Sequence, residues 1–466
     1  MPQDKKLLNV DDGLNMGRKA YSTMYRKYVN ISFGQLSSLL GLDVNYVRAE
    51  DCRVWDEDGN EYLDFMGGYG ALNVGHNHPA VLEALRKVET VPVILKPMSK
   101  FAAVLAYNLA QLAPGDLQNC WFCSSGTEAV EGALKLARLY TGKKDFIYCQ
   151  GGFHGKTMGA LSVTGKKLHQ EPFEPLVPGC VEIPFGDIDA LEKALKENQA
   201  AAFIVEPILG EGGIFLPPPG YLKEAKRLCS AYNTLFILDE IQTGLGRTGT
   251  FFACEQEDVV PDVLVMAKSL SGGVCPIGAY ITTPNIMKKA HGGGNLNRGL
   301  MLTSTYGENA HSAAAGIAAV NVIVEEGLAQ QAREKGEYFM NKLQALKEKY
   351  DIIKEVRGRG LLIGMEFADT GGLLDSLTVG MVNKLSREFL SSMLGAELLK
   401  SYRVLVLFTT NNPNVIRLEP PLTVSYEQID YVVESFDKLF GKHRSFMNFA
   451  LKSGKIAVSS LFRKYI

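Results

Sequence analysis

Residues able to transfer protons follow two short apolar runs within residues 235–270. The run Leu-Phe-Ile-Leu at 235–238 ends on Asp239 and Glu240, and the run at 263–267 ends on Lys268. Runs of four or five apolar residues are typical of buried parallel strands. In an open α/β sheet, reactive groups gather beyond the carboxyl ends of the strands. The pattern therefore predicts a carboxylate and an amine at one edge of a sheet.

An amine and a carboxylate so placed suit pyridoxal phosphate (PLP) chemistry. This cofactor is bound to a lysine as a Schiff base, and a buried aspartate against its ring nitrogen keeps that nitrogen protonated. Desolvation near a strand end also lowers the pKa of a lysine, so that a neutral amine is available. We therefore expect Lys268 and Asp239 to be catalytic. Taken singly, Lys268 would fit a surface lysine and Asp239 a helix N-cap.

A second pattern could hold a phosphate. Apolar residues 121–123 run into Ser-Ser-Gly-Thr-Glu at 124–128, and a helical pattern follows. The free N–H groups and the positive end of a helix attract an anion, and small residues allow a phosphate to approach the backbone. An ordinary serine or threonine N-cap would give the same pattern. Beside Lys268, we assign Ser125, Gly126 and Thr127 to the cofactor phosphate.

Residues 151–157 offer a competing prediction, because Gly-Gly-Phe-His-Gly-Lys-Thr comes close to a P-loop and residues 237–240 could pass for a Walker-B strand. A P-loop needs four residues between its first glycine and the Gly-Lys pair. Here the first position is Gln150, and Gly151 leaves only three. A nucleotide-hydrolysing enzyme is therefore a remote alternative, and it gives Lys268 no role.

The stretches LDEIQTGLGRTG at 238–249 and MAKSLSGG at 266–273 resemble the signature of class III, fold type I PLP-dependent aminotransferases. The resemblance extends over roughly residues 30 to 440. It implies an α/β fold, with a mostly parallel central sheet in a large domain and a smaller α+β domain. We expect an N-terminal arm and small-domain segment at 1–75, the PLP-binding domain at 76–330, the C-terminal small domain at 331–440, and a basic amphipathic tail at 441–466.

The resemblance also implies how the cofactor ring is held. Phe153 would stack on the ring, with His154 beside it as support, although an ordinary core aromatic and a buried histidine remain alternatives. Ile241 would contact the opposite face, and Gln242 would reach the phenolic oxygen.

The segment Ser-Thr-Tyr-Gly at 304–307 matches one that, in this family, brings Thr305 to the phosphate of the neighbouring subunit's cofactor. We therefore expect a homodimer, or a dimer of dimers, with shared active sites. The sequence departs from the family pattern at Glu308, where glycine is usual, and at Ala310, where proline is usual. Thr305 itself matches the family pattern.

Three residues are implied to bind substrate. Arg417 would hold the carboxylate of an amino or keto acid through two parallel hydrogen bonds. Glu211 would pair with Arg417 when no substrate carboxylate is present. Tyr69, in the glycine-rich residues 66–79, would line the entrance. A solvated strand arginine and a simple chain reversal are the corresponding alternatives.

Lys156 bears on the amine donor. Relatives that act on γ-aminobutyrate or N-acetylornithine typically have arginine here, whereas Phe-His-Gly-Lys at 153–156 resembles the putrescine aminotransferase branch. We expect a donor without a distal carboxylate, such as putrescine or cadaverine, and 2-oxoglutarate as acceptor. A lysine can still bind a carboxylate, so an acetylornithine-, ornithine- or 4-aminobutyrate-type enzyme remains an alternative. An aminomutase, decarboxylase or racemase on this fold, and a non-catalytic member acting through its tail, also remain open.

Bulk composition agrees with an ordinary globular enzyme: 466 residues, 46% hydrophobic, 21% charged, net charge −2. This charge balance predicts no nucleic-acid partner. The 8 cysteines are scattered without histidines at zinc-finger spacing, which predicts reduced thiols and no metal. The N-terminus lacks the apolar core of a signal peptide, and no apolar stretch is long enough to span a membrane. We therefore expect a cytoplasmic protein.

Overall fold

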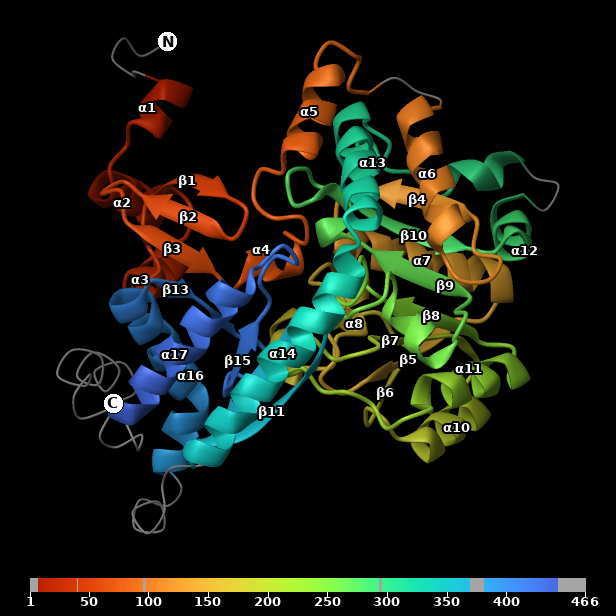
Figure 1. The fold of residues 1–466 in the computed structure, drawn as a ribbon. Coiled ribbons are helices and arrows are strands. Elements are labelled where there is room, and N and C mark those ends of the chain that lie inside the picture. The colour runs from red at the N-terminus through yellow and green to blue at the C-terminus, as the bar shows by residue number, and fades with distance from the viewer. Residues whose placement is uncertain (1–6, 40, 95–97, 293–295, 369–380, 443–466) are drawn as a thin grey trace.

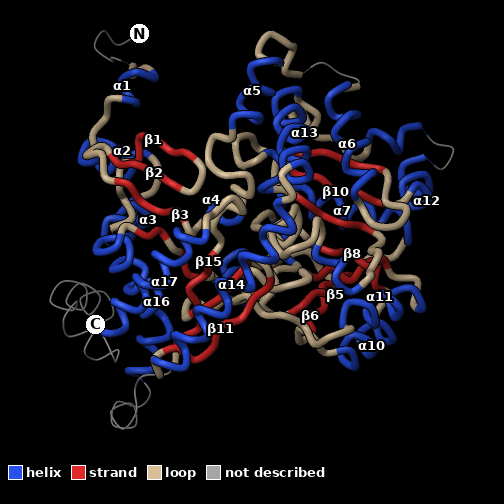
Figure 2. Tube along the Cα trace, in the orientation of Figure 1, coloured by secondary structure: helices blue, strands red, loops and turns tan. Residues whose placement is uncertain are grey.

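The computed structural model describes residues 7–39, 41–94, 98–292, 296–368 and 381–442 (Figure 1). The described residues form three sheets, one of seven strands and two of four. Figure 1 shows the seven-stranded sheet and its helices on one side of the molecule and the two four-stranded sheets on the other. Figure 2, in the same orientation, shows loops filling the space between these groups of strands. The predicted tail at 441–466 lies almost entirely outside the described residues.

The seven-stranded sheet is mostly parallel, as the sequence predicts. Its strand order is β4-β10-β9-β8-β7-β5-β6, and β10 alone in this sheet runs antiparallel to its neighbours. The strands are β4 (Asn119–Cys123), β5 (Asp145–Cys149), β6 (Cys180–Ile183), β7 (Ala200–Val205), β8 (Leu235–Asp239), β9 (Val263–Met266) and β10 (Gly278–Thr282).

Both faces of this sheet are buried, which explains the uninterrupted apolar runs. In β8, Phe236 and Leu238 pack into one hydrophobic cluster, while Leu235 and Ile237 pack into another. Successive side chains of a strand point to opposite faces, so a strand covered on both sides needs apolar residues at every position. The helices that contact its strands are α6 (Lys100–Leu112), α7 (Gly126–Thr141), α10 (Ile188–Glu197) and α11 (Tyr221–Ala231). Around them lie α5 (Pro79–Lys87), α8 (Met158–Ser162), α9 (Lys167–Gln170), α12 (Pro284–Met287) and α13 (Ala310–Glu325).

The two smaller sheets join distant parts of the chain. One has the order β1-β2-β3-β13, where β13 (Val404–Leu405) adds in parallel to β3 (Glu61–Asp64). Its other strands are β1 (Tyr46–Glu50) and β2 (Arg53–Asp56). The second is antiparallel, with the order β11-β12-β15-β14: β11 (Ile353–Arg359), β12 (Leu362–Phe367), β15 (Val415–Leu418) and β14 (Leu407–Phe408). Their helices are α1 (Val10–Leu14), α2 (Arg18–Tyr28), α3 (Ile31–Leu39), α4 (Gly67–Gly70), α14 (Leu328–Lys349), α16 (Met381–Tyr402) and α17 (Tyr426–Lys442).

The sequence Val-Arg-Gly-Arg-Gly-Leu-Leu-Ile-Gly-Met-Glu-Phe at 356–367 predicts a single strand, and this prediction is wrong. These residues belong to a hairpin between β11 and β12. Gly360 makes the reversal with φ of 55°, and a Cβ there would lie 2.6 Å from the carbonyl oxygen of Arg247. Only glycine combines this left-handed backbone with so close an approach. β12 is buried at every position and β11 only in part, so the turn between them is visible only in the backbone.

No single helix among the described residues is long and apolar enough to cross a membrane. By length and composition, the pair α13 and α14 passes the same test together, bent by 60°.

Candidate active site

A cavity of about 520 Å³ opens at the carboxyl ends of β5, β7, β8 and β9 and the start of α7. It brings together ten of the residues that the sequence nominates: Ser125, Gly126, Thr127, Phe153, His154, Glu211, Asp239, Ile241, Gln242 and Lys268. These residues come from separate strand ends, and the parallel sheet places all of those ends at one edge. The location agrees with the general rule for open α/β sheets.

Lys268 follows β9 and begins a short 3-10 helix, Lys268–Ser271. Its backbone is left-handed, with φ of 48°, a conformation that costs energy for a residue other than glycine. The side chain opens into the cavity. Burial lowers the pKa of Lys268, against the raising effect of the carboxylates of Glu419, Glu211 and Glu206. Desolvation thus favours the neutral amine, the form that can act as nucleophile or base.

Asp239, the last residue of β8, is buried and held at both of its oxygens. The ring nitrogen Nδ1 of His154 lies 2.7 Å from one oxygen, and the backbone N–H of Ile241 donates to the other at 3.1 Å. The backbone N–H of His154 donates in turn to the hydroxyl of Thr164 at 3.0 Å. These contacts fix the direction of a buried carboxylate that lines the cavity.

The adjacent carboxylate at the same strand end does something different. Glu240 accepts hydrogen bonds from the backbone N–H groups of Ala253 at 2.7 Å and Cys254 at 2.9 Å, and from the hydroxyl of Thr243 at 3.0 Å. Burial raises its pKa to about 7. Glu240 therefore anchors the glycine-rich loop that follows β8 instead of facing the cavity.

The start of α7 forms a narrow cradle. Ser125 caps the helix, and its hydroxyl donates to the carboxylate of Glu128 at 3.0 Å. A Cβ on Gly126 would lie 2.8 Å from Ile241, and one on Gly155 would lie 2.3 Å from the hydroxyl of Thr127. The first N–H groups of a helix have no partner within it. The first turn of α7 therefore offers backbone N–H donors at a place where there is no room for further side chains.

Glu211 and Arg417 form a buried ion pair beside the cavity, with 2.5 Å between Oε1 of Glu211 and Nη1 of Arg417. The other oxygen of Glu211 accepts from the backbone N–H and the hydroxyl of Thr410, at 2.8 and 2.6 Å. Burial alone would raise the pKa of Glu211, but Arg417 and Thr410 hold it at about 2. Glu211 lines the cavity, whereas Arg417 lies behind it.

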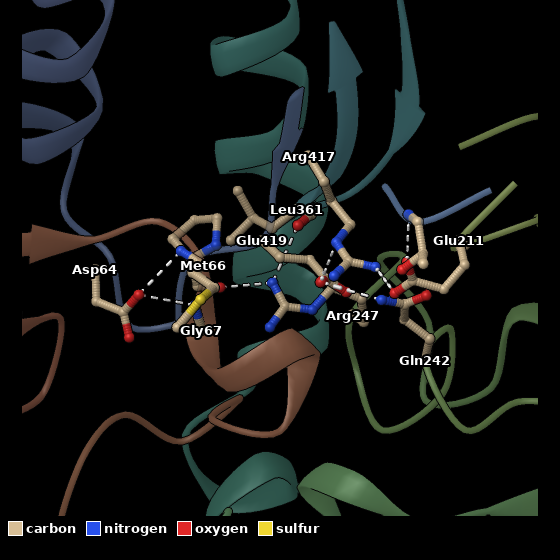
Figure 3. Close-up of polar contacts among 12 residues, drawn as sticks. Asp64, Met66, Gly67, Glu211, Gln242, Arg247, Leu361, Arg417 and Glu419 are labelled. Atoms are coloured by element: carbon tan, nitrogen blue, oxygen red, sulfur yellow. Dashed lines mark hydrogen bonds and ion pairs between the residues drawn. The ribbon is translucent and has the colours of Figure 1, made fainter. Parts of the chain in front are cut away.

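Arg417 has a second carboxylate partner that sequence reasoning missed (Figure 3). Oε2 of Glu419 lies 3.1 Å from Nε of Arg417 and accepts from the side-chain amide of Gln242 at 3.1 Å. Burial would lower the pKa of Arg417, but Glu419 and Glu211 together raise it. One signal was present: Arg417 and Glu419 stand two apart at the end of a strand, and such residues share a face.

Besides Arg417, three nominated residues do not line this cavity. Tyr69 lies on α4 with φ of 61°, is 49% exposed, and is close enough to Arg417 to raise the pKa of that guanidinium. Lys156 is exposed, with its ammonium 6.0 Å from the centre of the Phe153 ring. Thr305 is also exposed. Their predicted roles stay predictions.

Comparisons with known proteins agree with this geometry. The family model described as aminotransferase class-III matches residues 38–440. The chain belongs to the class III aminotransferases.

Solved structures of related enzymes cover most of the chain. Ornithine aminotransferase from Toxoplasma gondii, described with partial occupancy of PLP at its active site, is 30% identical, with a TM-score of 0.81 over 94% of this chain and 99% of that one. Acetylornithine aminotransferase from Elizabethkingia anophelis is 31% identical, with a TM-score of 0.73 over 92% and 100%. An (S)-enantioselective omega-transaminase from Thermomicrobium roseum is 29% identical, with a TM-score of 0.76 over 86% and 92%.

This aminotransferase uses pyridoxal phosphate, and the cavity fits the group. It offers a desolvated lysine, a fixed buried aspartate, and a helix start where added Cβ atoms would collide. Among the described residues, no cluster of three or more His, Cys, Asp or Glu side chains is arranged to hold a metal ion.

The P-loop alternative for residues 151–157 is wrong. The backbone N–H of Gly151 donates to the carbonyl of Gly165 at 2.8 Å, and that of Gly152 donates to the carbonyl of Cys149 at 3.1 Å. These donors are used inside the protein and cannot wrap a phosphate chain.

Glu206 is a further residue of the aminotransferase cavity, and the sequence analysis did not nominate it. It follows β7, lines the cavity, and accepts from the backbone N–H groups of Phe153 at 2.9 Å and Gly210 at 3.0 Å. Burial raises its pKa to about 7. The sequence signal was its position, since Glu206 ends a buried strand as Asp239 does.

Proposed function

We propose that this aminotransferase takes the amino group of a primary amine whose reacting carbon bears no carboxylate and delivers it to a keto acid, of which 2-oxoglutarate is the first candidate. The observation that supports this is the closed ion pair between Glu211 and Arg417. Because Glu211 occupies the guanidinium, a donor meets no free cation beside the reacting carbon. An amine of the form R–CH₂–NH₂ needs none.

Lys268 and Asp239 carry the proton chemistry in this proposal. When bound, pyridoxal phosphate supplies an electron-withdrawing ring that stabilises negative charge at the donor carbon. Lys268 would hold the cofactor and, once released, would move a proton from the donor carbon as a neutral base. Asp239, fixed by His154, would keep the ring nitrogen protonated. Ser125, Gly126 and Thr127 would receive the phosphate, with Phe153 and Ile241 on the two faces of the ring and Gln242 at the phenolic oxygen.

Arg417 serves the second half of the cycle. A keto acid brings a carboxylate, which can replace Glu211 and take two parallel hydrogen bonds from the guanidinium. Glu211 then moves toward the cavity that it already lines. The same pocket would thus accept an amine with Glu211 closed and a keto acid with Glu211 open.

For the donor, we favour a diamine such as putrescine or cadaverine, because Lys156 stands where a carboxylate-binding arginine is expected in other branches. The comparisons favour a second candidate. Two of the similar structures are ornithine and acetylornithine aminotransferases. These alternatives share the reacting –CH₂–NH₂ group and differ at the far end of the donor, where Tyr69 and Lys156 would lie.

We also propose a homodimer in which Thr305 reaches the partner's cofactor phosphate. Its exposure in the single chain is compatible with that role. Mixing a Lys268→Ala chain with a Thr305→Val chain tests this. A shared site predicts partial recovery of activity in the hybrid, because one of its two sites then has both residues. No recovery in a confirmed hybrid would contradict the proposal.

The donor is identified from the first half-reaction alone. The holoenzyme is mixed with putrescine, cadaverine, ornithine, N-acetylornithine or γ-aminobutyrate, without keto acid. The measurement follows the visible absorption band of the lysine-bound cofactor at about 420 nm. We expect the diamines to bleach it fastest, and 2-oxoglutarate to restore it. Faster bleaching by ornithine or N-acetylornithine would favour the second candidate. If only ornithine bleached the band, and did so through its α-amino group, the proposal would be contradicted.

A further inference from the structure

Glu419 lies at the centre of the charged groups behind the cavity, yet neither the chemistry above nor the family resemblance gives it a role. Its side chain is 0% exposed. Figure 3 shows it between Arg417 and Gln242, with Arg247 on its other side. Among the charged groups, it has the largest effect on the pKa of Lys268, of Arg417 and of Arg247. A carboxylate in that position affects every cation of the site.

The guanidinium of Arg417 has three nitrogens, and each has a different partner or none. Nε is taken by Glu419 at 3.1 Å, and Nη1 is taken by Glu211 at 2.5 Å. Nη2 is buried without a hydrogen-bond partner among the described residues. A carboxylate that forms two parallel bonds must therefore use Nη1 and Nη2. It displaces Glu211 and leaves Glu419 in place.

Packing explains why Glu419 cannot leave. Its backbone N–H donates to the carbonyl of Phe65 at 2.9 Å, directly after β15. A Cβ on Gly70 would lie 2.6 Å from Oε1 of Glu419, and one on Gly67 would lie 2.1 Å from its carbonyl oxygen. Glu419 is thus tightly packed against α4, whereas Glu211 belongs to a loop and faces the cavity.

We propose that Glu419 is a specificity-determining residue: a permanent carboxylate partner that fixes Arg417 and offsets part of its charge. Glu211 is then the one carboxylate that moves when the pocket changes from binding an amine to binding a keto acid. Because Glu419 already offsets part of the positive charge of Arg417, the guanidinium binds a substrate carboxylate weakly and releases it readily. This inference rests on the proposed function insofar as it assigns the acceptor carboxylate to Arg417.

Removing only the charge of Glu419 should therefore tighten carboxylate binding. In Glu419→Gln the amide oxygen can still accept from Nε of Arg417 and from the side-chain amide of Gln242. The arginine keeps its position but loses one negative neighbour. With unit charges a few ångströms apart in a partly buried site, the repulsion removed corresponds to roughly tenfold or more in affinity.

The test is calorimetry of glutarate binding to the holoenzyme. Glutarate has the two carboxylates of 2-oxoglutarate and no keto group, so it binds without reacting. We expect at least about tenfold tighter binding by Glu419→Gln. Asp430→Asn, which removes a charge from the exposed pair with Lys342, should stay close to wild type. Unchanged or weaker binding by Glu419→Gln would overturn the inference.

A second measurement needs no variant, in case Glu419→Gln does not fold. In a crystal structure of the wild-type holoenzyme with glutarate, Glu211 should have left Arg417 while Glu419 remains on Nε. A structure in which Glu419 leaves, or in which Glu211 stays, would overturn the inference.

Neither measurement requires amine transfer. Tighter glutarate binding in an enzyme that uses none of the amines tested would reject the proposed donor and leave the role of Glu419 standing.

Discussion

Two glutamates five residues apart face the same cavity with opposite charge behaviour. Glu206 meets only backbone N–H groups and lies near Asp239, and burial raises its pKa to about 7. Glu211 meets Arg417 and Thr410, which hold its pKa at about 2. Their burial is similar, so the difference comes from their partners: a buried carboxylate stays charged only where a cation faces it.

This contrast separates two ends of the site. The cofactor end, around Glu206, Asp239 and Lys268, is built from strand ends of one sheet, and burial there favours the neutral forms of Glu206 and Lys268. The recognition end, around Glu211 and Arg417, joins a loop after β7 to β15 of another sheet. It holds a cation between two anions, and an arriving carboxylate can replace one of them. The first end suits chemistry, and the second suits exchange of substrates.

The largest effect should come from the cofactor end. Lys268→Ala removes the base that moves the proton, so turnover should fall on the order of 10⁴-fold. The variant should still bind the cofactor, because the cradle at α7 and Asp239 are unchanged. Turnover and cofactor content are measured together, with Lys438→Ala, an exposed lysine, as control. Normal turnover by Lys268→Ala would show that another group performs the transfer.

Glu206 predicts a pH effect on stability. Its folded pKa of about 7 lies above the ordinary value of 4.5. Between these values the folded protein retains a proton that the unfolded chain releases, so this residue lowers the free energy of unfolding as pH rises. The loss reaches about 3 kcal/mol above pH 7. Glu206→Gln should flatten that slope in denaturant unfolding of the apoprotein at pH 5 and pH 8, whereas the exposed Glu434→Gln should not. Equal slopes would contradict the assignment.

At the recognition end, Arg417→Lys should separate the two half-reactions. An ammonium cannot form the two parallel bonds, so the KM for 2-oxoglutarate should rise about 30-fold. The amine half-reaction, followed by bleaching of the cofactor band without keto acid, should change much less. An equal loss in both halves would mean that Arg417 serves the general architecture and not the acceptor.

The smallest effect concerns the hydroxyl that holds Glu211. Thr410→Val removes that donor and keeps the backbone N–H and the side-chain shape, so Glu211 should leave Arg417 more easily. We expect the KM for 2-oxoglutarate to fall about fivefold. Thr410→Ser keeps the hydroxyl and should resemble wild type. If serine and valine behave alike, the hydroxyl does not control Glu211.

The same division decides what the sequence could predict. The cofactor end was predictable because each part is local: Asp239 and Lys268 follow apolar strands, and Ser125 to Thr127 begin a helix. The parallel sheet then has little freedom in where it places them. The mostly parallel sheet and the closing of Glu211 on Arg417 were also expected.

The missed features depend on contacts between distant segments. Thr410 meets Glu211 across 199 positions, and Glu419 meets Gln242 across 177. No local pattern specifies such pairs. The hairpin at 353–367 was missed for another reason: β12 is buried at every position and β11 only in part, and the turn at Gly360 between them is visible only in the backbone.

The left-handed backbone at Lys268 has a consequence for how this protein can be improved. That conformation is easy for glycine and costs roughly 1–3 kcal/mol for other residues. The position that must carry the amine is therefore one where selection for folding alone would choose a different residue. Screens that select for thermal stability without selecting for activity should therefore enrich glycine at position 268. Such variants would gain stability and lose catalytic activity.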